Sequence, residues 1–266
     1  MFVSSTPWLG VIVLALAPVS AHAALPADPL GSPMWQRLGT TLFGSDPVRF
    51  DDRVRVDFPE IAEDQSSFPV TVDARGINGV KRILLFADLN PIPLAIDYAP
   101  QRARAFLGTR IKLDQRTPVR GAVQLEDGSW LVSGGWVDAA GGGCSAPPAS
   151  RVKGDWAEHL GQVRGIAVRE RDGTHIRLAF RHPMDTGFVT NIPTYNLDTV
   201  ALSGAGSKSY GTMRIEASVA EDPTISVIAD TAAGEAIVLR GSDTNGIRYD
   251  GSLAVHDAAP APAAVG

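Results

Sequence analysis

Cys144 is the one cysteine of this 266-residue chain, and its side chain is the strongest candidate for covalent chemistry. It follows three consecutive glycines, Gly141, Gly142 and Gly143, and precedes Ser145-Ala146-Pro147-Pro148. Glycines leave the backbone free to move, and prolines stop a regular element from continuing. A thiolate is a nucleophile and a sulfur ligand. The pattern predicts an exposed thiol on a flexible arm, with the glycines as its hinge, that can reach into another molecule.

The residues around Cys144 in the sequence favour a carrier over a self-contained catalyst. No Lys, Arg or His lies within six residues of it, and the nearest cations are Arg151 and Lys153. Nothing local therefore lowers the thiol pKa from its reference value of about 8.5. We expect partner enzymes to activate this cysteine, and we expect no enzymatic activity from the chain itself.

A cysteine hydrolase is the catalytic alternative, with His159, His175 or His182 as the base. Such enzymes hold the nucleophile rigidly beside an aligned base. A run of three glycines next to Cys144 is the opposite of that preorganisation, so the hydrolase is disfavoured.

A metal site is a further alternative, and the sequence favours none. His175 and His182 are seven residues apart, a spacing that puts them on opposite faces of one strand. The chain has no Cys-x-x-Cys pair of the kind that binds zinc. Copper held by Cys144, His182 and Met184 is conceivable chemically, because these ligands are soft. We expect Met184 to pack in the core or at a domain interface instead, and we expect no cofactor.

The first 23 residues have the pattern of a cleaved export signal. An apolar run over 8–19 is followed by Ala21-His22-Ala23, a small-x-small cleavage pattern, although no Lys or Arg precedes the run. An uncleaved anchor or a buried helix is the alternative. No later apolar run approaches the about 20 residues of a membrane span. We therefore expect an exported protein, soluble after cleavage.

Charge and cysteine count limit the partners. The net charge of −5 gives no basis for binding nucleic acid or an anionic membrane. An unpaired cysteine in an exported protein indicates a reactive group or an intermolecular disulfide. A homodimer linked through Cys144 is therefore expected during purification.

Short strands separated by turn sequences dominate the chain and predict an all-β fold. Segment 33–43 alone has helical periodicity. The expected architecture is two immunoglobulin-like antiparallel β-sandwiches, at 30–138 and 160–256, joined by a Gly/Pro-rich arm at 139–154. A disordered tail is expected at 257–266. The expected strands lie at 48–58, 68–72, 82–87, 94–98, 103–113, 119–125 and 130–137, then at 163 onward, 176–180, 195–202, 212–219, 224–228, 236–239 and 247–249.

Two sandwiches with a cysteine arm between them resemble the sulfur-oxidation carrier SoxYZ. The glycine-flanked Cys144 resembles the arm of SoxY, and His182-Pro183-Met184-Asp185-Thr186-Gly187 is similar to a stretch of SoxZ. Segments 219–223 and 242–246 support the SoxZ likeness in the expected order. The chain therefore resembles a single-chain SoxY–SoxZ fusion, a form associated with quinoprotein dehydrogenases. It departs from SoxY in having Ser145-Ala146 after the cysteine and in continuing into a second domain.

The resemblance implies a periplasmic carrier that holds a sulfur-containing or other thiol-reactive intermediate on Cys144. The implied partners are sulfur-oxidation cytochromes and a hydrolase, or a quinoprotein dehydrogenase. The alternative is an adaptor that binds the dehydrogenase or its cytochrome without covalent cargo. The two halves are expected to pair in cis as SoxY and SoxZ pair in the heterodimer.

Overall fold

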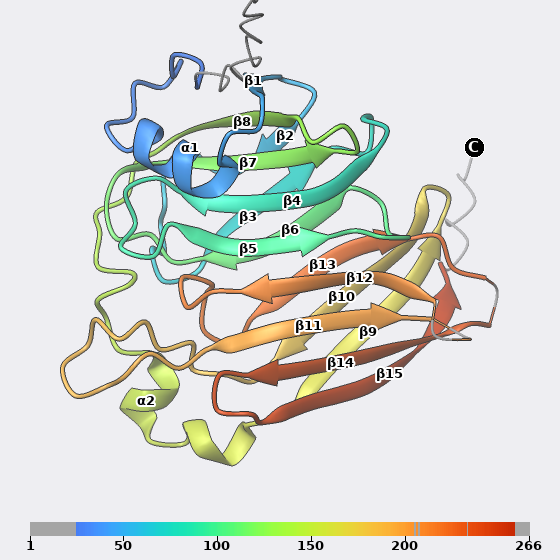
Figure 1. Ribbon diagram of the computed structural model, residues 1–266. Helices are drawn as coiled ribbons and strands as arrows, with labels where there is room; N and C mark the ends of the chain where they lie inside the picture. The colour runs from blue at the N-terminus through green and yellow to red at the C-terminus, as the bar shows by residue number, and fades with distance from the viewer. Residues whose placement is uncertain (1–24, 205, 207, 233, 259–266) are drawn as a thin grey trace, which may run out of the picture.

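The computed structural model describes residues 25–204, 206, 208–232 and 234–258. The expected export signal and nearly all of the expected tail lie outside these residues. Across the described ranges, no helix has the length and apolar character needed to cross a membrane. The prediction of an all-β chain is confirmed, with one helix of more than two turns among the described residues (Figure 1).

The first half of the chain contains one helix and eight strands. They are α1 (Trp35–Phe43), β1 (Val48–Phe50), β2 (Arg55–Asp57), β3 (Phe68–Asp73), β4 (Val80–Ala87), β5 (Leu94–Ala99), β6 (Phe106–Ile111), β7 (Thr117–Leu125) and β8 (Trp130–Val137).

The second half contains two short helical segments and seven strands. They are α2 (Ala149–Lys153), the 3-10 helix η1 (Trp156–His159), β9 (Val163–Glu170), β10 (Gly173–Phe180), β11 (Leu197–Ser203), β12 (Ser209–Ile215), β13 (Thr224–Ala229), β14 (Ala236–Asp243) and β15 (Arg248–Asp257). The arm expected at 139–154 thus ends in α2, and Asp257, expected in the tail, closes β15.

The single strand expected at 48–58 is two strands in different sheets. β1 pairs in parallel with β8, and β2 pairs antiparallel with β3. Between them the chain turns, with the Val54 N–H donating to Asp51 O at 3.1 Å and the Arg53 guanidinium held by the Asp51 carboxylate. The alternation of apolar and polar residues does not reveal that the chain passes from one sheet to the other here, because alternation continues through both strands.

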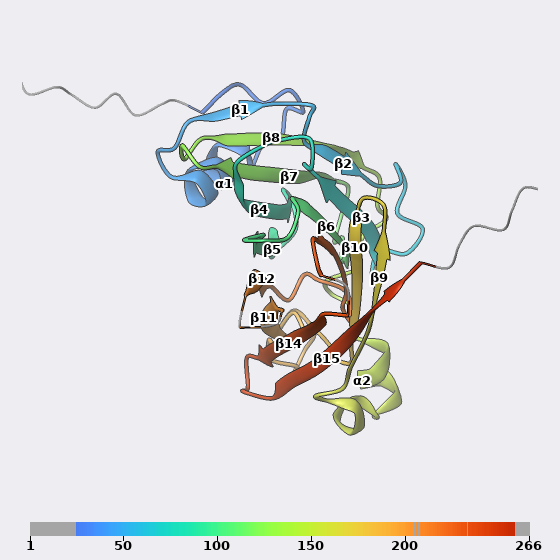
Figure 2. The same ribbon diagram turned by 90° about the vertical axis from the view of Figure 1, so that its right-hand side faces the viewer.

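The two halves share two sheets that face each other (Figure 2). One sheet runs β1-β8-β7-β4-β5-β12-β11-β14, and the other runs β2-β3-β6-β13-β10-β9. At the junction β5 pairs with β12, placing Ile96 opposite Ile215, and β6 meets β13 at Gly108 and Ser226. β15 pairs antiparallel with β14 and, at its end, in parallel with β9. It therefore links the two sheets at the outer end of the second half.

One hydrophobic core lies between the sheets and includes side chains of both halves, such as Ile83, Leu107, Ile176 and Val227. A smaller cluster lies on the outer face of the first sheet, where α1 covers it with Trp35.

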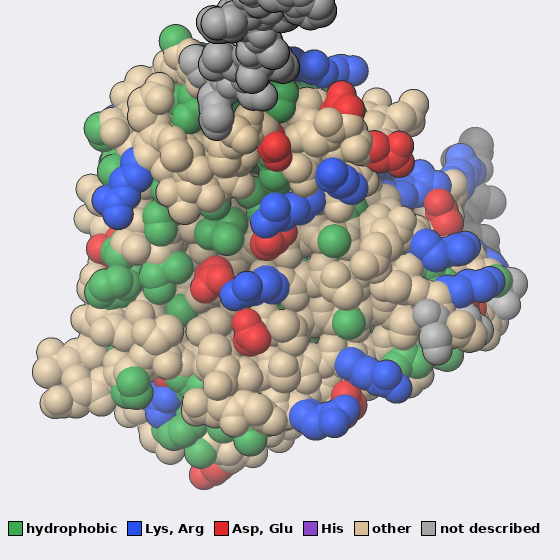
Figure 3. All heavy atoms as spheres, viewed as in Figure 1, with side chains coloured by type: hydrophobic (Ala, Val, Ile, Leu, Met, Phe, Trp, Pro, Cys, Tyr) green, Lys and Arg blue, Asp and Glu red, His purple; other side chains and the backbone are tan. Residues whose placement is uncertain are grey.

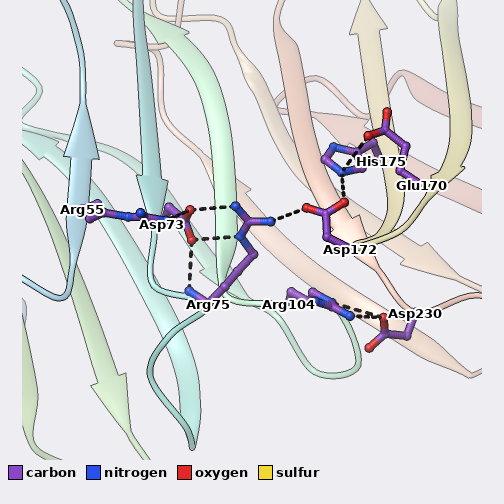
Figure 4. A network of polar contacts seen from close by, with 8 residues as sticks. All are labelled: Arg55, Asp73, Arg75, Arg104, Glu170, Asp172, His175 and Asp230. Atoms are coloured by element: carbon purple, nitrogen blue, oxygen red, sulfur yellow. Dashed lines mark hydrogen bonds and ion pairs between the residues drawn. The ribbon is translucent and has the colours of Figure 1, made fainter. Parts of the chain in front are cut away.

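Ion pairs add to this junction at the surface (Figure 4). Arg75 of the first half bonds Asp73 at 2.9 Å and reaches Asp172 of the second half at 2.7 Å. Arg104 bonds Asp230 at 2.9 Å across the same boundary. Ion pairs at the surface are typically worth about 1 kcal/mol or less. The apolar core and the paired strands therefore supply most of the cohesion between the halves.

Because the halves share sheets and core, we predict that they unfold as one unit. Ile215 is 1% exposed, and Ile215→Ala should destabilise the whole chain by about 2–5 kcal/mol. Tryptophan fluorescence and circular dichroism should then report the same, lowered midpoint in denaturant.

The matched control is Ile166→Ala, at a position that is 59% exposed, which should change stability by about 0.5 kcal/mol or less. Two separate transitions, with only one shifted by Ile215→Ala, would contradict a shared folding unit.

Candidate functional site

Two of the three glycines before Cys144 allow close packing of the arm against the first half. A β-carbon at Gly143 would lie 2.1 Å from Gln65 O, and one at Gly141 would lie 2.7 Å from Asp114 O. The Gly143 N–H donates to Leu113 O at 3.0 Å. Gly142 has open space around it, so a side chain would not clash there. Its φ of +89° is what favours glycine at this position. The glycine run therefore fits the arm onto the end of β6.

The Cys144 side chain is fully buried, so the expectation of an exposed thiol is wrong for this conformation. Its neighbours Gly142 and Ser145 are exposed, which means that the arm lies at the surface with its cysteine turned inward. Asp114 fixes this arrangement, since its carboxylate accepts the Cys144 N–H at 3.2 Å and the Ser145 hydroxyl at 2.8 Å.

The second half covers the cysteine with the same segment that resembles SoxZ. The Thr186 hydroxyl donates to Cys144 O at 2.5 Å, and the Phe188 N–H donates to Thr186 Oγ1 at 3.4 Å. Asp185, which is 1% exposed, accepts the Arg151 Nε–H of α2 at 3.0 Å. We call Thr186 and the Asp185–Arg151 pair the latch, because they join the 181–195 loop to the segment that carries Cys144.

A buried lysine of the first half shares this environment. Lys112 is 4% exposed, and its ammonium donates to Met184 O and, at 3.1 Å, to Ala217 O. Burial lowers the pKa of Lys112 to about 8, against the opposing attraction of Cys144 and Asp185. The ammonium is therefore largely charged at neutral pH.

Burial raises the pKa of the Cys144 thiol to about 12; Asp114 adds to the rise, and Lys112 opposes it. In this conformation the sulfur is a protonated thiol and a poor nucleophile. The arrangement shields the Cys144 thiol from solvent, so reaction at the sulfur requires the arm to move.

His182 supports the segment next to the cysteine and does not activate it. Its Nδ1 accepts the Met184 N–H at 2.9 Å, and its Nε2 lies 3.6 Å from an oxygen of Asp243. Burial lowers the pKa of His182 to about 4. Met184 has φ +53°, a costly angle for a residue with a side chain, and this hydrogen bond helps to hold it.

The histidines do not form the cysteine hydrolase that the sequence left open. Within the described residues, Cys144 makes no hydrogen bond to a histidine. His159 lies near Gln162, and His175 near Asp172, at 3.4 and 2.9 Å respectively.

Two of the side chains considered as copper ligands, His182 and Met184, already accept hydrogen bonds from backbone N–H groups. The Met184 sulfur accepts the Leu197 N–H at 3.3 Å, and His182 Nδ1 accepts the Met184 N–H. The expectation that Met184 packs in the core is confirmed, since it is fully buried there.

Glu170, Asp172 and His175 form a cluster with ligand atoms close enough for a cation (Figure 4). Asp172, however, already bonds His175 through one oxygen and Arg75 through the other. A guanidinium at this position repels a cation, so the cluster serves the junction between the halves.

Sequence reasoning missed Lys112 and Asp114, which lie beside Cys144, and it singled out Thr186 only as part of the 182–187 stretch. Lys112 did give a signal, because it stands between Ile111 and Leu113 at the end of an apolar strand. A lysine in that position is rarely solvated and usually has a specific partner.

Residues 40–144 match the family model described as "Sulfur oxidation protein SoxY". The match ends at Cys144 itself. No curated protein sequence matches the chain.

Two solved structures show limited similarity. The sulfur carrier protein SoxY from Chlorobium limicola f thiosulfatophilum is 23% identical, with a TM-score of 0.37, over 40% of this chain and 96% of that one. A β-glycosidase from Bacteroides vulgatus is 10% identical, with a TM-score of 0.24, over 79% of this chain and 25% of that one. The likeness to the SoxY family thus covers residues 40–144, which is less than half of the chain.

Proposed function

We propose that the chain is a sulfur carrier that binds its cargo covalently at Cys144 and stores it in a closed conformation. The family match supports a carrier role that is not enzymatic. The observation that carries the proposal is that the family match ends at a cysteine enclosed by residues of both halves, including Thr186 and Lys112.

The transfer step is a sulfur exchange. When the arm is open, the Cys144 thiolate attacks the outer sulfur of a partner's persulfide and forms a new S–S bond. The partner's S–S bond breaks, and its thiolate leaves with the electron pair. The same step in reverse delivers the sulfur, so no external oxidant is consumed.

The arm can open without unfolding of the protein, because few contacts hold it closed. The Thr186–Cys144 hydrogen bond has a net value of about 0.5–1.5 kcal/mol. Gly142 and Ser145, on either side of the buried residues, already face solvent. The arm can therefore detach locally while the shared sheets stay intact.

The chain is proposed to be a SoxY–SoxZ fusion, because residues 182–187 of the second half resemble a stretch of SoxZ and Thr186 bonds Cys144. The proposed compartment is the periplasm. The proposed partners are sulfur-oxidation cytochromes and a hydrolase, or a quinoprotein dehydrogenase. A disulfide-linked dimer would form only from the open state, because an intermolecular bond needs an exposed sulfur and Cys144 is buried while the arm is closed.

The same burial favours a second candidate, an adaptor that binds a redox partner and carries nothing. In that case Cys144 would be a core residue whose thiol never reacts. The predictions below separate the two candidates.

The first prediction concerns the cargo. Protein taken from its native compartment should carry an added mass of sulfur or of a sulfur oxoanion, measured by intact-mass spectrometry. Cys144→Ser should remove the added mass, and Ser145→Ala, one residue away, should keep it. An unmodified mass under every growth condition would favour the adaptor.

The second prediction concerns the latch. Thr186→Val keeps the shape of the side chain but removes the hydroxyl that holds Cys144 O. The open state should become more populated, so iodoacetamide should alkylate Cys144 about 2- to 10-fold faster. The control is Thr194→Val, since the Thr194 hydroxyl donates to Thr186 O and does not reach the arm. Equal rates for both variants and the wild type would show that the latch does not limit access.

The third prediction concerns alkaline pH. Folding raises the Cys144 pKa to about 12, so between the pKa of an unfolded thiol, about 8.5–9, and this value the unfolded chain releases a proton that the folded chain keeps. The free energy of unfolding should therefore fall as the pH rises above 9. Cys144→Ser should lack this component, and the stability difference between the two proteins should change only above pH 9. A constant difference from pH 7 to 11 would mean that the thiol is not buried in solution.

A further inference from the structure

A groove crosses the outer face of the first sheet where the two halves join. Its volume is about 810 Å³, and it extends over β4, β5, β12, β11, β14 and β15. Side chains along its floor are small, which hollows the surface: Ala99, Thr199, Ala201, Thr212 and Ser242. Helix α1 covers only the neighbouring part of the sheet, around β4, β7 and β8 (Figure 1).

The groove is basic, although the chain as a whole is acidic. Five cations line it, namely Lys81, Arg82, Arg214, Arg240 and Arg248, against the two carboxylates of Asp97 and Asp250. Figure 3 shows positive and negative side chains near one another on the face of the molecule seen in Figure 1. The whole chain has a net charge of −5, whereas the side chains that line the groove have a net positive charge.

The cations of the groove differ in whether they form ion pairs with the groove's own carboxylates. Arg82 bonds Asp97 through two hydrogen bonds of 2.7 Å, and Arg248 lies 3.3 Å from Asp250. Lys81 and Arg240, by contrast, form no ion pair within the part of the chain that the structure describes. They leave positive charge available on opposite sides of the groove.

Strand β11 connects the groove with the loop that covers Cys144. Strand β11 begins at Leu197, whose N–H contacts the Met184 sulfur beside the latch. Thr199, which lines the groove, is two residues further along the strand, or about 7 Å. A partner bound in the groove would contact β11, the strand whose first residue adjoins Met184.

We propose that this groove is the docking surface for a protein partner whose contact surface is net acidic. Its carboxylates would pair with Lys81 and Arg240, while Asp97 and Asp250 would face its donors. A nucleic acid or another uniform polyanion fits less well, because two carboxylates lie among the cations. That this partner exchanges sulfur with Cys144 rests on the proposed function, whereas the docking itself does not.

The test uses a photoreactive p-benzoylphenylalanine at Ser252 of the full-length protein in its native cells. Ser252 is exposed and two residues beyond Asp250 on β15, so the probe lies beside the groove without filling it. The expected result is a cross-link to a protein through a peptide of net negative charge. Arg240→Glu should abolish the cross-link. The control is Arg177→Glu, which makes the same change of charge at an exposed position of β10 in the opposite sheet. This variant should keep the cross-link.

Binding of the purified cross-linked partner should then weaken about tenfold in Arg240→Glu and should weaken with added salt. It should persist in Cys144→Ser, so docking can hold even if the carrier proposal fails. The proposal is overturned by a cross-link to nucleic acid or polysaccharide, by a cross-linked peptide without net negative charge, by no cross-link at all, or by equal effects of Arg240→Glu and Arg177→Glu.

Discussion

Strand pairing between the halves is the interaction on which the rest of the structure depends. β5 with β12 and β6 with β13 turn two short sandwiches into one pair of continuous sheets over a single core. Separated, the halves would each expose two strand edges, which favour aggregation. The pairing also fixes the 181–195 loop of one half over the arm of the other. Both the enclosed cysteine and the groove exist only because the halves are joined in this way.

The enclosure of Cys144 reconciles two demands on a carrier. A sulfur adduct that is always exposed would exchange with any thiol it met, and one that is permanently buried could not be delivered. Here the thiol is shielded by contacts that are individually weak, chiefly the Thr186 hydrogen bond. The cation of Lys112 lies in the same enclosure, where it favours the thiolate against the larger effect of burial. Storage is thus the resting state, and reactivity comes with opening.

The sequence was informative where local rules decide the structure. Helix α1 and nearly all strands follow their hydrophobic periodicity, and the segment 182–187 marked a region that does lie at the cysteine. The glycines were ambiguous, because they permit either a mobile arm or close packing, and only the positions of Gln65 and Asp114 distinguish these. Lys112 was missed because it lies far from Cys144 in the sequence and near it only after folding.

The central claim is that Cys144 accepts sulfur only through an open state of the arm. The most direct measurement is the rate of persulfide formation on Cys144, followed by mass spectrometry, as the concentration of glutathione persulfide is raised. If opening limits the reaction, the rate reaches a plateau set by the arm, and the plateau is higher in Thr186→Val. A rate that rises linearly to that of a free thiol would contradict the closed resting state, and the absence of any adduct would contradict the carrier.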